Sequence, residues 1–101
     1  MIDITAVKNF KELNISVRLL LTLISISSAT GEIRTDKGAL AKAVGVSKQT
    51  VGTHINEFAR CNLLKFKYSG VARLNPDFYY SGNPDKKSSA VFEYQLFKSD
   101  V

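Results

Sequence analysis

The stretch 37–58, KGALAKAVGVSKQTVGTHINEF, constrains the fold of this chain most, because it holds two short helical patterns joined by a turn. In the first pattern, apolar residues recur at helical spacing up to Val44. Gly45 then ends the helix, since the residue after a helix often needs a positive φ, which glycine adopts at little steric cost. Ser47 is a good N-cap for the second helix. Two short helices with a glycine turn describe a helix-turn-helix.

The second helix of this pair has one apolar face and one polar face. At about 100° per residue, Val51, Ile55 and Phe58 point one way. The opposite face carries Gln49, Gly52, Thr53, Asn56 and Arg60. Glutamine and asparagine pair with adenine, arginine with guanine, and threonine with the thymine methyl group or a phosphate, while glycine permits close backbone approach. This face suits a DNA groove; the alternatives are a merely solvated face or a helix used in protein–protein assembly.

The spacing of small and aliphatic residues around the turn is informative in its own right. Ala41 lies four residues before Gly45, where a larger side chain would push the two helices apart, and Val51 lies six residues after it. This spacing resembles the helix-turn-helix of bacterial DNA-binding regulators. The aliphatic residue stands at Ile55 rather than at His54, which favours the winged variant of the motif. The alternative is an ordinary helical hairpin.

A β-hairpin is predicted directly after the helix-turn-helix. Residues 63–68 alternate apolar and basic residues, with Leu64, Phe66 and Tyr68 on one face, and residues 71–74 return after a Ser-Gly turn. This order resembles the winged-helix fold, so we expect a mainly α protein with a small β-hairpin, an α+β winged helix-turn-helix. The length fits a single domain, 1–101. Its expected parts are an N-terminal helical segment (1–30), the helix-turn-helix (36–60), the wing (63–74) and a C-terminal extension (75–101).

The residues before the helix-turn-helix are expected to be mostly helical. Apolar residues recur at helical spacing within 2–13, and Asn14 is a plausible cap for an almost wholly apolar helix over 15–28. A short strand is expected over 32–35, and Asp36 is expected to cap the next helix.

The C-terminal extension gives a weaker signal. The aromatic run 78–80 is expected to cover the core. Over 88–97 the pattern fits either a helix or a strand, and we favour a helix from about Asp85, with Asp85 as its cap after Pro84.

Positive charge is concentrated in the helix-turn-helix and the wing. The net charge of the chain is +5, but residues 34–73 hold eight basic and two acidic residues, a surplus of six. A concentrated basic field suits a polyanion such as DNA, and the alternative is a chance asymmetry of a solvated surface. The residues expected to contact DNA are Lys37, Ser47, Lys48, Gln49, Thr50, Gly52, Thr53, Asn56, Arg60, Lys65, Lys67 and Arg73.

Several classes of protein are disfavoured by what the sequence lacks. Cys61 is the only cysteine and His54 the only histidine, so an internal disulfide and a zinc finger are excluded. A DNA-nicking enzyme has tyrosines to draw on but needs more histidines for its metal, and no phosphate-binding Gly-rich loop appears. We therefore expect no enzyme activity, no cofactor and no metal, and we expect Cys61 to be a buried thiol.

The expected setting is the bacterial cytoplasm. The N-terminus lacks the pattern of a signal peptide, and the longest apolar run, 15–26, is too short to span a bilayer. No membrane association and no small-molecule substrate are expected.

The residues after the wing carry a more specific resemblance. The run Leu74-Asn75-Pro76-Asp77-Phe78, with Gly82 beyond it, follows the predicted winged helix. Over about 36–97 the chain resembles the RepL-type replication initiators of Firmicute plasmids. This resemblance implies sequence-specific binding of double-stranded DNA by a plasmid- or phage-type replication initiator or a transcriptional regulator. Centromere-binding adaptors of plasmid segregation and conjugation-control repressors also use compact winged helices and stay open as alternatives.

A homodimer is expected as well. One winged helix covers few base pairs, and bacterial proteins of this kind usually pair on two half-sites. The helix over 15–26, the segment 91–97, or both are apolar enough to form a two-fold seam.

Overall fold

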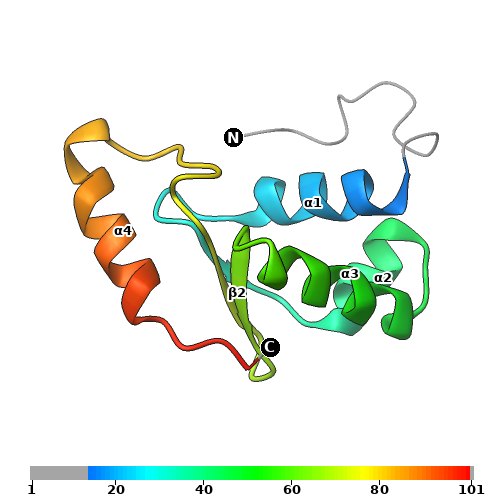
Figure 1. Cartoon of the computed structure of the whole chain (residues 1–101). Helices are drawn as coiled ribbons and strands as arrows, with labels where there is room; N and C mark the ends of the chain where they lie inside the picture. Colours follow the sequence, from blue (N-terminus) through cyan, green and yellow to red (C-terminus); the bar gives the residue numbers. More distant parts are fainter. Residues whose placement is uncertain (1–13, 101) are drawn as a thin grey trace.

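The computed structural model of the chain describes residues 14–100 and has the order of elements that defines a winged helix (Figure 1). The elements are α1 (Ile15–Ile26), β1 (Glu32–Arg34), α2 (Lys37–Val44), α3 (Lys48–Arg60), β2 (Leu64–Lys67), β3 (Val71–Leu74), the 3-10 turn η3 (Pro84–Lys86) and α4 (Lys87–Leu96). The expected α+β winged helix-turn-helix is confirmed. The helical pattern expected within 2–13 lies outside the described residues.

The sheet is antiparallel, with β3 in the centre between β1 and β2. In its register Ile33 lies opposite Ala72, and Ala72 opposite Phe66, so these three side chains share one face. All three are buried, as the alternation of burial along β2 and β3 requires. The other face of the sheet carries the charged side chains of the same strands.

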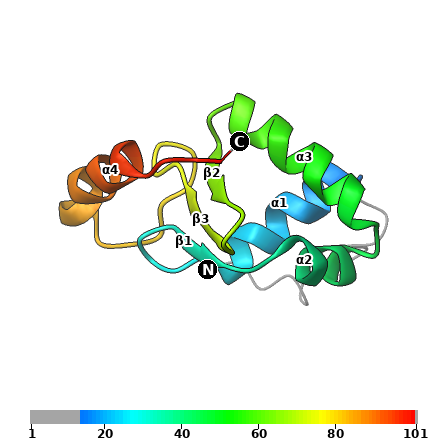
Figure 2. The same cartoon turned by 90° about the horizontal axis from the view of Figure 1, so that it is seen from below.

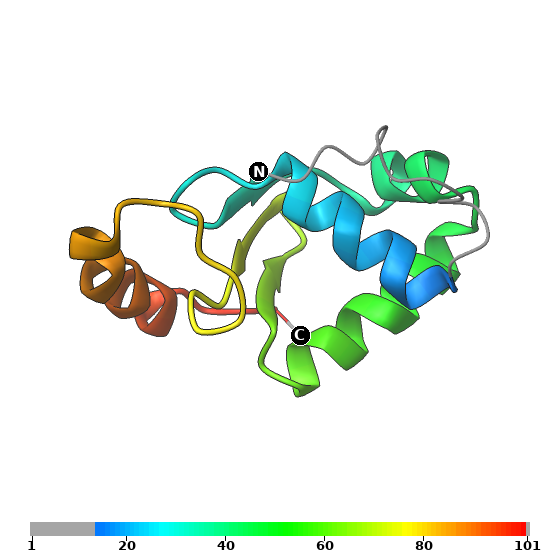
Figure 3. The ribbon, with the colours of Figure 1, turned by 90° about the horizontal axis from the view of Figure 1, so that it is seen from above.

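The core lies between this sheet and the first three helices. Leu19 and Leu23 of α1, Val51 and Ile55 of α3, and Leu40 of α2 are completely or almost completely buried in one cluster. Figures 1 and 3 show α1, α2 and α3 on one side of the sheet and α4 on the other. The helix-turn-helix is therefore built on the core, whereas α4 is an addition to the outer face of the sheet.

The predicted N-caps of the first three helices and the predicted end of α2 are confirmed, while α1 ends at Ile26 rather than at about residue 28. The side chains of Asn14, Asp36 and Ser47 accept hydrogen bonds from the backbone N–H of Val17, Ala39 and Thr50, and so cap α1, α2 and α3. Gly45 has φ +81° at the end of α2, and its N–H donates to the carbonyl oxygen of Ala41 at 2.8 Å. After α3, Asn62 also adopts the left-handed conformation, with φ +58°.

Two details of the prediction are wrong, the place of Tyr68 in the strand and the burial of Cys61. Tyr68 is 61% exposed, because β2 ends at Lys67 and Tyr68 belongs to the turn, where strand alternation no longer sets the direction of a side chain. Cys61 is exposed, because it is the C-cap residue of α3 and lies past the last turn that packs on the core. The expected buried thiol is thus on the surface.

The C-terminal extension differs from expectation in detail. The predicted helix is present as α4, but Asp85 does not cap it; Asn83 accepts from the N–H of Asp85 at 2.9 Å, and α4 has no side-chain cap. In the aromatic run only Tyr79 packs on the core, whereas Phe78 is exposed and Tyr80 donates its hydroxyl to the carbonyl oxygen of Asn83. A local turn therefore replaces the expected aromatic cover.

Candidate nucleic-acid interface

The side of α3 turned away from the core presents a row of exposed polar side chains. Gln49, Thr53, Asn56 and Arg60 are all exposed, whereas Val51, Ile55 and Phe58 are buried. Because this division follows the helical period, burial of the apolar face fixes the direction in which the polar face points. These four predicted contact residues are therefore brought together on one surface.

The first turn of α3 has its hydroxyl groups already engaged. The Oγ of Ser47 accepts from the N–H of Thr50 at 3.1 Å and lies 2.9 Å from the Oγ1 of Thr50. The Oγ1 of Thr53 donates to the carbonyl oxygen of Gln49 at 3.1 Å. These hydrogen bonds restrain the hydroxyl groups of the first turns of α3.

Gly52 is not part of the exposed row, contrary to the prediction that it faces a DNA groove. It is buried under the side chain of Lys37, and a Cβ added to it would lie 3.3 Å from the Lys37 Nζ. That ammonium group is 4.7 Å from the centre of the Tyr68 ring, a cation–π distance. Gly52 thus lets Lys37 cross from α2 over α3 to the turn of the wing.

Tyr68 also belongs to the surface between the helix-turn-helix and the wing, although it was not among the residues predicted to contact DNA. With Asp36, Lys37, Gly38, Lys48 and Phe66 it lines an open groove of about 320 Å³ between the helix-turn-helix and the wing. The only hint in the sequence was its place directly before the Ser-Gly turn, where a strand commonly ends.

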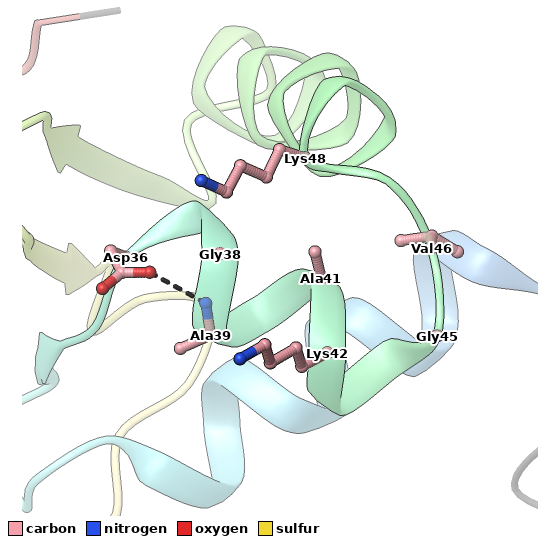
Figure 4. Close-up of a pocket in the computed structure, with 8 residues that line it drawn as sticks. All are labelled: Asp36, Gly38, Ala39, Ala41, Lys42, Gly45, Val46 and Lys48. Atoms are coloured by element: carbon pink, nitrogen blue, oxygen red, sulfur yellow. Dashed lines mark hydrogen bonds between the residues drawn. The ribbon is translucent and has the colours of Figure 1, made fainter.

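A second groove runs along the helix-turn-helix itself (Figure 4). It has a volume of about 740 Å³ and is open to solvent, and its lining includes Asp36, Ala41, Lys42 and Lys48. In Figure 4 the side chains of Lys42 and Lys48 extend toward the end of the groove where Asp36 caps α2. Lys42 was counted in the basic segment but was not among the predicted contacts. The groove thus has one lysine from α2 and one from the start of α3 in its lining.

The three predicted basic contacts of the wing lie elsewhere. Lys65 and Arg73 are cross-strand partners, and they and Lys67 project from the outer face of the sheet, which α4 covers. Lys65 donates to the carbonyl oxygen of Tyr94 at 2.8 Å, and Arg73 lies 3.2 Å from a carboxylate oxygen of Glu93. The structure does not join these bases to the row on α3.

The Asn-Pro motif after β3 has a structural role at the junction of α3 and the wing. The Nδ2 of Asn75 donates to the carbonyl oxygen of Asn62 at 2.8 Å, and its N–H donates to the carbonyl oxygen of Leu63 at 2.9 Å. Pro76 is buried directly after it. The hydroxyl of Tyr94 donates to the Oδ1 of Asn62 at 2.7 Å, and burial raises the pKa of this phenol. The motif thus fixes the direction in which the wing leaves α3.

Other kinds of site are sparse in the part of the chain that the structure describes. Within residues 14–100, no three histidine, cysteine or acidic side chains gather as metal ligands. None of the helices described there has the length and hydropathy needed to cross a bilayer.

Three helices on a three-stranded antiparallel sheet, with a hairpin directly after the second helix of a helix-turn-helix, define a winged-helix protein. The chain belongs to the family of Firmicute plasmid replication proteins (RepL), whose model matches residues 12–101. The resemblance noted from the sequence over about 36–97 is therefore confirmed, and the matched region also includes α1 and β1. A search of curated proteins and a search of solved structures gave no match.

Proposed function

We propose that this chain is a sequence-specific, double-stranded DNA-binding protein that acts as a replication initiator. The observation that carries the proposal is the exposed row Gln49, Thr53, Asn56 and Arg60 on α3. An α-helix fits the major groove, where each base pair presents a distinct pattern of donors and acceptors, and these side-chain types read such patterns. Among the roles open to a winged helix, membership of a plasmid replication family favours initiation over transcription control or segregation.

The charges around this row support contact with the DNA backbone. Lys48 and Lys42 line the groove beside α3, and Lys37 points between α3 and the wing. Backbone contacts of this kind fix the register of a protein on a duplex, while the base contacts give specificity. The proposed site of action is the cytoplasm, where plasmid DNA resides, and the proposal involves no catalysis.

Salt dependence provides the first test. Each phosphate neutralised by a basic side chain contributes about −0.9 to the slope of log K against log salt concentration. If a dimer contacts roughly six phosphates, we expect a slope near −5, measured by fluorescence anisotropy with a duplex that carries the replication origin. The control is Lys86→Ala, which removes an exposed charge remote from α3 and should leave the slope unchanged. A flat salt response of the unaltered protein would contradict the proposal.

We further propose that the protein binds DNA as a homodimer. Phe92 and Leu96, one helical turn apart on α4, are 60% and 64% exposed, and Val17 and Ile26 of α1 are exposed as well. A symmetric pair buries such residues and matches the two half-sites of a palindromic origin.

Sedimentation of the protein at micromolar concentration decides this point. We expect a dimer, and we expect Phe92→Ser with Leu96→Ser to shift it toward the 11.2 kDa monomer. A change to serine at an exposed residue on the opposite side of α4, Lys87→Ser, should not. A monomer that stays a monomer on saturating DNA would refute the dimer.

A further inference from the structure

The bases of the wing are all covered by the C-terminal arm, which we define as residues 87–100. Lys65 donates to carbonyl oxygens at the end of α4, and its Nζ is 4.6 Å from the centre of the Tyr94 ring. Lys67 lies 4.6 Å from the centre of the Phe97 ring, and Arg73 pairs with Glu93. Figures 1 and 2 show that α4 lies on the opposite side of the sheet from the helix-turn-helix. Lys65, Lys67 and Arg73 therefore each have a partner in the arm. Glu32 of β1 is a second partner of Arg73, at 3.5 Å, and it also pairs with Arg34, at 2.9 Å.

The end of the arm also covers the open edge of the sheet. β2 is an edge strand, so half of its backbone groups lack a partner within the sheet. The Oγ of Ser99 accepts from the N–H of Phe66 at 3.0 Å, and the N–H of Asp100 donates to the carbonyl oxygen of the same residue at 2.8 Å. The Oδ2 of Asp100 accepts from the N–H of Tyr68 at 2.8 Å. A carboxylate thus sits at the base of the wing turn, next to the ring that Lys37 contacts.

The covering groups have the chemistry of a DNA backbone. Carbonyl oxygens at the negative end of a helix and two carboxylates face lysine, arginine and backbone N–H groups, which are the donors that bind phosphate. A phosphodiester offers the same anionic acceptors, so the arm and a DNA strand fit the same donors.

The arm is held mainly by polar contacts at the surface. Within α4 only Ala90 and Tyr94 are buried, whereas Glu93 and Asp100 are exposed. Exposed ion pairs contribute little to stability and are weakened by salt, so the arm can leave without unfolding the core. Residues 87–100 hold two basic and two acidic residues. Departure of the arm thus changes which groups are covered and leaves the net charge near the wing almost unaltered.

We propose that the outer face and edge of the wing form a second surface for the DNA backbone, which the C-terminal arm occupies in the free protein and DNA takes over on binding. The proposal rests on the DNA-binding function proposed above. It assigns Lys65, Lys67 and Arg73 to phosphate contact only after the arm has moved. A purely structural arm, by contrast, stays on the wing in the complex.

Hydrogen exchange on the full-length protein separates these possibilities, with a mixed-sequence duplex at low salt as the probe. We expect α3 to become protected on adding DNA, which reports on the proposed function. The N–H of Asp100, which donates to the Phe66 carbonyl oxygen in the free protein, should exchange faster, which reports on displacement of the arm. Protection of α3 with unchanged or slower exchange at Asp100 would overturn the displacement alone. Without protection of α3, the DNA-binding function fails and the displacement with it.

A matched pair of variants adds an affinity measurement. Asp100→Ala removes the carboxylate that accepts from the Tyr68 N–H, while Asp85→Ala removes another exposed carboxylate, which has no described contact with the wing. Both change the net charge by one. We expect Asp100→Ala to bind the duplex about threefold more tightly than Asp85→Ala does. The reason is that the Asp100 carboxylate no longer competes with a DNA phosphate for the Tyr68 N–H. Equal affinities of the two variants would overturn the competition.

Discussion

Replacing Ile55 with alanine is expected to lower the free energy of unfolding by about 2–5 kcal/mol, measured by urea denaturation. The side chain of Ile55 is 0% exposed, in the middle of α3 and within the core cluster. Its truncation removes buried apolar surface and leaves a cavity that the surrounding helices and sheet only partly fill. Since a domain of this size is stable by only about 5–15 kcal/mol, the loss is a large fraction of the total.

The matched control is the same substitution at Ile26, the last residue of α1. This side chain is 45% exposed in the monomer, so its truncation is expected to cost less than about 1 kcal/mol at a protein concentration low enough to dissociate the proposed dimer. If both variants lowered the free energy of unfolding by the same amount, Ile55 would not be part of the hydrophobic core. DNA binding by Ile55→Ala should be compared at low temperature, where enough of the protein stays folded for the row on α3 to be tested.

The helix-turn-helix was predictable from the sequence because local rules fix it. A cap such as Asp36 or Ser47 bonds to a backbone N–H three residues later, and the positive φ of Gly45 is a property of one residue. The helical period then separates the buried face of α3 from its exposed face. Each of these signals acts over a few residues, so the sequence shows it directly.

The parts that were mispredicted depend on contacts between distant segments. Gly52 lies on the polar face of α3 by periodicity, yet a lysine from α2 covers it. Arg73 projects from the outer face of the sheet, as alternation requires, but the alternation does not reveal that Glu93 would meet it there. The bond between Asp100 and Tyr68 joins residues 32 positions apart. No periodic pattern encodes such a pairing, because it follows from where α4 packs.

Lys48, rather than a basic residue of the wing, is the residue with which to test contact with the DNA backbone. Lys67 and Arg73 of the wing were expected to hold phosphates, but both face the C-terminal arm. Lys48 is exposed at the start of α3 and lines both grooves of the helix-turn-helix. It is therefore the basic residue best suited to comparison with the base-reading side chains.

Asn56→Ala is expected to relax the sequence specificity of DNA binding, whereas Lys48→Ala is expected to weaken binding to all duplexes about equally. An asparagine amide that pairs with a base edge is worth about 1–3 kcal/mol of discrimination against the wrong base, so its loss should narrow the affinity gap at one or two positions of the origin. Loss of a phosphate contact should instead lower the magnitude of the salt slope by about 0.9 at unchanged specificity.

A panel of origin duplexes, each with one base pair changed, measures both effects by anisotropy titration. Asn56 and Lys48 are exposed, so both variants should unfold at the same urea concentration as the unaltered protein. That comparison rules out a folding defect as the cause of either change. The same uniform loss for both variants across the panel would mean that α3 does not read bases, because a side chain that pairs with one base edge must discriminate at that position.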